Sequence, residues 1–172
     1  MNKTIILDTN VYGEILIERC SEEIIEKIRT NKAIIVYGTD VIKSELNKTP
    51  EHVKYKGILT RTSLLQIYNS IIDHGLTTSP LAEYLAREYF KEYKELFSTR
   101  RTKEKHNEEN LKNDFKIVAI ASLNSMDIIV SSDKRTLLSE VSSKIYNKVN
   151  TENNLRIPEM IEYQKFKEDY LK

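Results

Sequence analysis

The chain has 172 residues, of which 40% are hydrophobic and 31% are charged. These values are ordinary for a globular protein, so we expect a single domain over residues 1–172 and exclude a disordered chain, a collagen-like repeat and a disulfide-rich scaffold. The 27 basic and 26 acidic residues leave a net charge of +1, so any contact with nucleic acid has to be local.

No feature of the sequence points to secretion or to a membrane. The only cysteine, Cys20, cannot form an internal disulfide, and Asp8 interrupts the first apolar run well before it reaches the length of a signal-peptide core. The most apolar internal segment, residues 117–121, is far shorter than the ~20 residues that a membrane span needs. We therefore expect a cytoplasmic protein that does not insert into a membrane.

Short apolar runs alternate along the chain with segments of helical periodicity. Runs that are rich in β-branched residues and bounded by polar or turn residues predict strands over residues 4–7, 33–37, 128–131 and 145–149. Apolar residues at helical spacing predict helices over residues 11–19 (capped by Thr9 or Asn10), 22–29, about 40–49 and 109–123. Since parallel strands need a crossover, usually a helix, we expect an α/β fold with a mostly parallel sheet and helices on both faces.

The middle of the chain, about residues 52–108, shows no strand pattern. Apolar residues from Leu64 to Ile71 predict an amphipathic helix that Gly75 ends in the left-handed conformation, and Ser79 with Pro80 begins another. We expect a wholly helical insertion here. Tyr84, Tyr89 and Tyr93 could stack on bases, although their helical spacing indicates packing.

Two acidic residues directly follow predicted strands, and two more lie on predicted helices. Asp8 and Asp133 come after the strands at residues 4–7 and 128–131, where sites form in parallel sheets. Glu45 and Asp114 lie beside apolar stripes of their helices. Carboxylates gathered at one edge repel unless a cation compensates, and Mg²⁺ prefers such oxygen ligands. The pattern predicts a divalent-metal site able to activate water against a phosphodiester.

Four motifs, in order, resemble those of the PIN-domain family of metal-dependent nucleases. They are a hydrophobic strand followed by Asp-Thr-Asn at residues 8–10, Ser-Glu-Leu around Glu45, an aspartate before small and apolar residues at Asp114, and a strand followed by Ser-Ser-Asp at Asp133. The resemblance spans residues 5–133. It implies a Rossmann-like three-layer α/β/α sandwich and the hydrolysis of RNA phosphodiester bonds with Mg²⁺ or Mn²⁺ as the cofactor.

Carried over by position, the acidic quartet of the family becomes Asp8, Glu45, Asp114 and Asp133. The resemblance implies Asp8 and Asp114 as direct metal ligands, Asp133 as a water-mediated or second-metal ligand, and Glu45 as the residue that orients the attacking water. Asn10 and Ser131 would be supporting polar residues. It also implies an RNA substrate, a homodimer and, in VapC-type toxins, a protein antitoxin; the same chemistry suits an RNA-processing enzyme.

The chain departs from the family pattern in two places. Thr136 stands where an aromatic residue often follows the last aspartate, and the connection from Glu45 to Asp114 is longer than in compact VapC-type toxins. Each acid also has a structural interpretation, since Asp8 and Asn10 could form only a turn and helix cap, and Glu45 or Asp114 could be a solvated helix-face charge.

Two other functions remain open. One is a catalytically inactive PIN-like domain that binds RNA or acts as an assembly scaffold, against which the intact quartet argues. The other is a receiver-like signalling domain, which needs adjacent acids after the first strand that the sequence does not show. Zinc and glycine-loop nucleotide cofactors are not expected, because the histidines are scattered and no glycine motif is present.

A basic cluster near residue 100 could contact RNA phosphates. It is interleaved with glutamates, which is also typical of a solvated loop. Its residues are Arg100, Arg101, Lys103 and Lys105.

Overall fold

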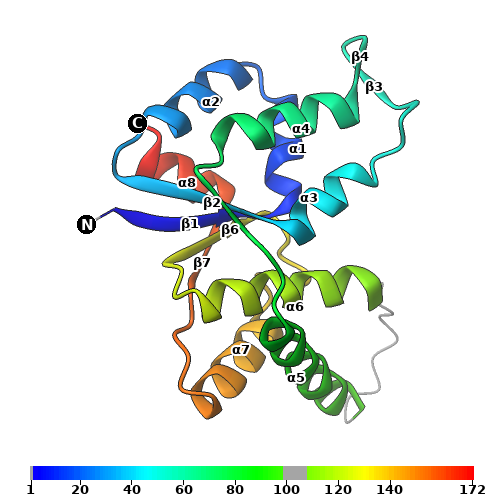
Figure 1. Cartoon of the computed structure of the whole chain (residues 1–172), viewed down its shortest axis with the longest axis vertical. Coiled ribbons are helices and arrows are strands. Elements are labelled where there is room, and N and C mark those ends of the chain that lie inside the picture. Colours follow the sequence, from blue (N-terminus) through cyan, green and yellow to red (C-terminus); the bar gives the residue numbers. More distant parts are fainter. Residues whose placement is uncertain (1, 99–107) are drawn as a thin grey trace.

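A computed structural model describes residues 2–98 and 108–172, and Figure 1 shows a central sheet with helices on both faces. The strands of this sheet run parallel in the order β5-β2-β1-β6-β7. They are β1 (Lys3–Leu7), β2 (Ile34–Thr39), β5 (His74–Leu76), β6 (Ile128–Ser131) and β7 (Glu159–Glu162). The α/β fold with a parallel sheet between helical layers, which the sequence predicted, is confirmed.

The helices form two layers, one on each face of the sheet (Figure 1). One layer contains α1 (Thr9–Ile17), α2 (Ser21–Thr30), α4 (Thr60–Ile71) and α8 (Tyr163–Tyr170). The other contains α5 (Pro80–Ser98), α6 (Glu108–Leu123) and α7 (Glu140–Glu152). The short helix α3 (Asp40–Asn47) packs against α4 and α6. Thr39 caps α3 by accepting the Ile42 N–H at 3.1 Å.

The core is densest around the two central strands. All residues of 5–7 and 128–131 are at most 1% exposed, because both faces of β1 and β6 are covered by helices. On α6, residues 117–121 are equally buried, and the small side chains of Ala119 and Ala121 let this helix approach the sheet closely. Tyr89 and Tyr146 pack edge-on beside Phe115 in the same layer, so Tyr89 is a core residue, whereas Tyr84 is 47% exposed.

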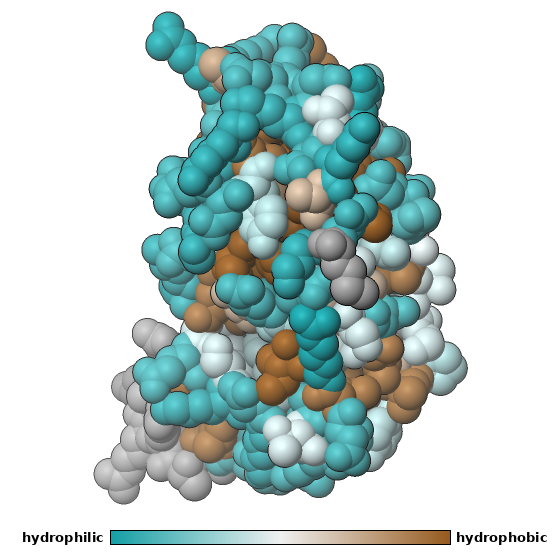
Figure 2. Space-filling model, turned by 90° about the vertical axis from the view of Figure 1, so that its left-hand side faces the viewer, coloured by the Kyte–Doolittle hydropathy of each residue, from teal (hydrophilic) through white to brown (hydrophobic). Residues whose placement is uncertain are grey.

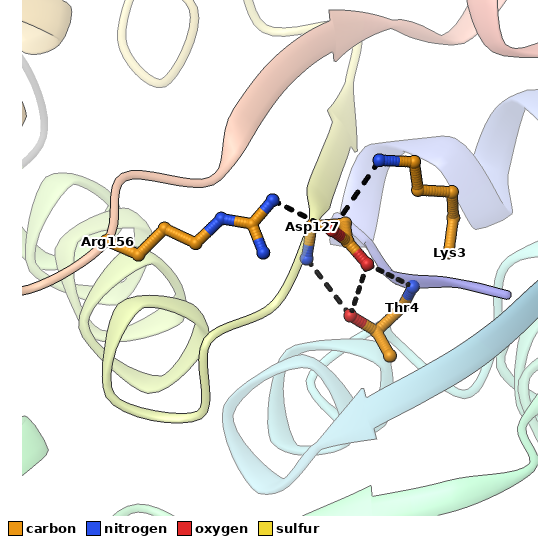
Figure 3. A network of polar contacts seen from close by, with 4 residues as sticks. All are labelled: Lys3, Thr4, Asp127 and Arg156. Carbon is orange, nitrogen blue, oxygen red and sulfur yellow. Dashed lines mark hydrogen bonds and ion pairs between the residues drawn. The ribbon is translucent and has the colours of Figure 1, made fainter. Parts of the chain in front are cut away.

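A polar network fixes the amino ends of β1 and β6 (Figure 3). The Asp127 carboxylate accepts the Thr4 N–H at 2.9 Å and the Thr4 hydroxyl at 3.1 Å, and it binds Arg156 at 2.8 Å. Lys3 lies 3.6 Å from the same carboxylate. The backbone hydrogen bond from Thr4, followed by the side-chain bonds from Arg156 and Thr4, lowers the pKa of Asp127 to about 2. This network pins the register in which Ile5 pairs with Ile128.

The strand predicted at residues 145–149 is wrong. These residues lie inside α7, which Ser139 caps by accepting the Ser142 N–H at 3.1 Å. The buried residues of α7 follow a helical spacing along one face: Ser142, Ile145, Tyr146, Val149 and Asn150. The β-branched residues suggested a strand, but the burial of this face against neighbouring helices outweighs a weak local preference.

The insertion predicted at about 52–108 is not wholly helical. β5 pairs with β2 as an edge strand of the central sheet, and β3 (Lys54–Tyr55) and β4 (Ile58–Leu59) form a separate hairpin. Gly75 therefore lies in a strand and does not end α4, which stops at Ile71. These strands are only two or three residues long, so they carry no alternating pattern that could be read in the sequence.

Two glycines allow a matched stability test. A Cβ at Gly38 of β2 would lie 2.3 Å from both the Tyr68 hydroxyl and the Ile72 Cδ1 atom, so Gly38→Ala should lower the free energy of unfolding by about 1–3 kcal/mol. Nothing lies within 4 Å of a Cβ at Gly13 of α1, so Gly13→Ala should raise it by about 0.5–1 kcal/mol. Urea denaturation measures both, and equal stability of the two variants would contradict this packing.

The surface is largely polar on the face that Figure 2 shows, with apolar residues in smaller areas between hydrophilic ones. Within residues 2–98 and 108–172, no helix combines the length and the apolar character that crossing a bilayer requires.

Candidate active site

The strand order forms a topological switch point at the carboxyl ends of β1 and β6, the position at which open parallel sheets have a crevice. From β1 the chain moves outward to β2 and β5, and from β6 it moves outward to β7 on the other side. The strand order therefore reverses between β1 and β6, and ligands of open parallel sheets bind outside the strand ends at such a point. Asp8 directly follows β1, and Asp133 comes two residues after β6. Both acids thus lie where the sequence placed them.

Asp8 is buried, with 4% of its surface exposed, and its carboxylate is fully engaged. One oxygen accepts the Thr9 N–H at 2.7 Å; the other accepts the Ser131 hydroxyl at 2.7 Å and the Asn10 side-chain amide at 2.6 Å. Asp8 is also the N-cap of α1, so the expectation that Thr9 or Asn10 caps this helix is wrong. Asp8 is the last residue with extended backbone before α1, so its carboxylate is in position to accept the Thr9 N–H at the start of the helix.

Asn10 and Ser131 connect Asp8 to the loop that carries Asp133. The Asn10 amide donates to the Ser131 hydroxyl at 3.1 Å, and its carbonyl oxygen accepts the Ser132 N–H at 3.0 Å. The Ser131 hydroxyl accepts the Asp133 N–H at 3.0 Å. These two residues therefore hold the ends of β1 and β6 in one arrangement, as the supporting role predicted for them requires.

Thr136 lies between Asp114 and Asp133. Its hydroxyl contacts Asp114 Oδ2 at 2.7 Å and also Asp133 Oδ2, while the other oxygen of Asp133 accepts the backbone N–H groups of Arg135 at 2.8 Å and Thr136 at 2.9 Å. Because a hydroxyl has one proton, it can donate to only one of these carboxylates, and the other contact calls for a proton on a carboxyl group. Thr136 therefore links α6 to the loop after β6.

Glu45 is held from two sides by neutral donors. The Thr9 hydroxyl donates to Oε2, and the Asn113 side-chain amide donates to Oε1 at 2.7 Å. Thr9 directly follows Asp8, and Asn113 directly precedes Asp114. Glu45 of α3 is therefore hydrogen-bonded to a sequence neighbour of each aspartate. The sequence pattern did not single out Asn113, and it marked Thr136 only as a departure from the family motif; their closeness in sequence to Asp114 and Asp133 was the available signal.

The carboxylates influence one another's pKa. Burial, with the charges of Glu45 and Asp133, raises the pKa of Asp8 to about 6. Burial and the charges of Asp8, Asp133 and Glu45 raise the pKa of Asp114 to about 8. Burial also acts on Asp133, but hydrogen bonds from Thr136 and Arg135 outweigh it and lower its pKa. Asp114 therefore carries a proton for much of the time near neutral pH, because four acids share one crevice.

The donor chemistry fits a hard divalent cation, since carboxylate oxygens are the ligands that Mg²⁺ and Mn²⁺ prefer. Burial, together with repulsion between the acids, raises the pKa of Asp8 and Asp114, and a bound cation would favour the charged forms that these effects disfavour. The carboxylates do not form a ready-made cage: among the residues that the structure describes, no three acidic, histidine or cysteine side chains stand in a metal-holding geometry. Metal binding would therefore require some of these side chains to rearrange.

The basic cluster of the sequence cannot be placed relative to this crevice. Arg100, Arg101, Lys103 and Lys105 lie outside the described residues. The described cation that acts on the quartet most clearly is Arg135, whose charge contributes to lowering the pKa of Asp133.

Comparison with known proteins supports the fold assignment. No family model and no curated protein matches the sequence. A solved structure of VapBC2 from Rickettsia felis bound to a DNA fragment from their promoter is similar, with a TM-score of 0.52 and 15% identity over 93% of this chain and 98% of that chain. The chain shares its α/β fold with this structure, which agrees at the level of the fold with the resemblance seen in the sequence motifs.

Two further solved structures are similar. VapBC-5 from Mycobacterium tuberculosis, a member of the VapBC family of toxin-antitoxin systems, has a TM-score of 0.42 and 21% identity over 76% of this chain and 85% of that chain. FitAcB from Neisseria gonorrhoeae has a TM-score of 0.47 and 17% identity over 81% of this chain and 93% of that chain.

Proposed function

We propose that the chain is a metal-dependent endoribonuclease. The observation that carries this proposal is the meeting of two buried or half-buried acids of raised pKa, Asp8 and Asp114, with Glu45 and Asp133 at the switch point of the sheet. Buried acids that repel one another destabilise a fold, so their presence in a crevice favours a functional site. The PIN-like fold supports nuclease activity in general.

In this proposal Asp8 and Asp114 bind Mg²⁺ or Mn²⁺ directly, and Asp133 contributes through water. A bound ion would lower the pKa of a coordinated water and offset charge that develops on the phosphate. Asn10 and Ser131 keep the Asp8 carboxylate in place through their hydrogen bonds. Glu45 orients the attacking water and accepts its proton, because both of its oxygens retain free lone pairs.

The proposal extends to partners through the likeness to VapBC2 and the family resemblance of the sequence motifs. The chain would act as the toxin component, with a protein antitoxin as its inhibitor and RNA as its substrate. Family resemblance adds a homodimer as the expected assembly.

The deciding experiment incubates the purified chain with a mixture of RNAs in Mn²⁺, in Mg²⁺ and in EDTA. We expect cleavage to products with 5′-phosphates in either metal and none in EDTA, because the carboxylates alone neither activate water nor stabilise the developing charge. Full cleavage in EDTA contradicts the metal mechanism. RNA binding without cleavage in any metal favours the second candidate, an inactive RNA-binding scaffold, which the absence of a ready-made metal geometry among the described residues supports.

A further inference from the structure

The side chain of Glu45 is held by the side-chain amide of Asn113, the residue that precedes Asp114. Asn113 donates to Glu45 Oε1 at 2.7 Å, and the Thr9 hydroxyl donates to Oε2. We propose that Asn113 is a positioning residue that, together with Thr9, sets the orientation of Glu45 toward the attacking water; this rests on the proposed nuclease function.

The contact between Asn113 and Glu45 is the inner of two contacts that join α3 to α6. Glu109 lies one helical turn before Asn113, and Lys48 lies one turn after Glu45, so the two pairs share the facing sides of these helices. Lys48 and Glu109 form the outer ion pair at 2.7 Å. Both of these side chains are more than half exposed, whereas Glu45 and Asn113 are partly buried. The lysine ammonium is hydrogen-bonded to Glu109 and its charge reaches Glu45 only over a longer distance, so the hydrogen-bond donor to Glu45 on α6 is a neutral amide.

The neutrality of both donors has a chemical consequence. A carboxylate has about four lone-pair positions, and two of them accept the Asn113 amide and the Thr9 hydroxyl. The remaining positions can accept hydrogen bonds from water. A cation at Asn113 would compete for the proton-accepting role of Glu45, whereas an amide fixes the side chain without neutralising its charge. Asn113 therefore restricts the rotation of Glu45 while preserving it as a base.

A double-mutant cycle on cleavage tests this role. Asn113→Ala should lower kcat by about 10- to 100-fold with KM unchanged within about twofold, the range seen when an orienting partner is lost. In the Glu45→Ala background, Asn113→Ala should have no further effect, because its target is gone. Thr9→Ser keeps the hydroxyl, so its kcat should stay near that of the wild type. Thr9→Val removes the hydroxyl, so its kcat should fall by about as much as that of Asn113→Ala. Asn147→Ala, which removes only a local bond to the Ser143 carbonyl, is the control.

A second readout needs neither metal nor activity. In the metal-free protein the side-chain amide protons of Asn113 should give a shifted NMR signal that moves in Glu45→Gln and stays in place in Glu22→Gln, a change on the distant helix α2. If the Asn113 amide signal does not shift in Glu45→Gln, or if Asn113→Ala cleaves RNA as fast as the wild-type chain, the positioning role alone is overturned. A wild-type chain that does not cleave in Mn²⁺ overturns the proposed nuclease function instead.

Discussion

Asp114→Asn is expected to reduce the rate of RNA cleavage in saturating Mn²⁺ by at least about 100-fold. A direct metal ligand supplies several kcal/mol of charge stabilisation in the transition state, and each 1.4 kcal/mol corresponds to about a tenfold change in rate. Asp114 is a clean target, because its only hydrogen bond among the described side chains is from Thr136. The variant should therefore fold. Initial rates on a defined RNA, measured against Mn²⁺ concentration, check the effect.

Asp169→Asn provides the control for charge removal. Asp169 lies on α8 and pairs with Lys165 one turn away at 2.7 Å, far from the crevice in the fold, so its loss should leave cleavage within about twofold of wild type. If Asp114→Asn remains folded and cleaves at a rate close to that of Asp169→Asn, then the direct ligand has been assigned to the wrong residue.

The stability of the metal-free chain is expected to fall as the pH rises from about 4 to about 8. The folded-state pKa values of Asp8, about 6, and Asp114, about 8, both lie above the unfolded value near 3.8. Their contribution to stability is therefore complete below about pH 4 and is lost as the pH rises through each folded pKa. Each pKa unit corresponds to about 1.4 kcal/mol, and each kcal/mol changes the Tm of a chain of this size by about 2–4 °C, so the two raised pKa values together are expected to lower Tm by more than about 10 °C.

Asp114→Asn should flatten this pH dependence above about pH 6 and raise the metal-free Tm at about pH 8, because it removes the group that is hardest to ionise. It should also shrink the rise in Tm that Mg²⁺ produces, since stabilisation follows RT ln(1 + [L]/Kd). Thermal melts with and without metal measure both effects. A pH dependence as steep in Asp114→Asn as in Asp169→Asn would show that other groups cause it.

Asp8→Asn is expected to stabilise the metal-free chain less than Asp114→Asn does, although it also removes a repelled charge. Asp8 accepts from Thr9, Asn10 and Ser131 and caps α1, and the loss of an N-cap alone costs about 0.5–2 kcal/mol. This loss opposes the gain from removing a repelled charge. The two interpretations of Asp8 that the sequence left open, helix cap and site acid, are thus compatible, because one carboxylate occupies both positions.

The centre of the fold could be predicted from the sequence because buried parallel strands have a distinctive pattern. The strands next to Asp8 and Asp133 are apolar on both faces, so their extent and the acids that follow them stand out. Glu45 and Asp114 could be placed on helices for a similar reason, since the apolar stripes beside them are regular.

The edges of the fold and the links within the site could not be predicted. In the edge strand β7 only Ile161 is buried, so no apolar run marks it, and the helical stripe of α7 was hidden by its β-branched residues. Asn113 became part of the site only when α3 and α6 came together, a contact between residues that are 68 positions apart. Local periodicity carries no information about such a pair.

The pairing of β1 with β6 has a consequence for the order in which the protein is made. Asp8 and Ser131 are separated by 123 positions, so the first strand leaves the ribosome long before its central neighbour exists. Until residue 131 has emerged, β1 can pair only with β2, and the Asp8 carboxylate lacks the Ser131 hydroxyl that holds it. Pairings over such long separations form late and slowly. A nascent chain therefore carries a partial sheet and an incomplete set of acids until Asp133 has emerged, and the pairing of β1 with β6 is one of the later steps of folding.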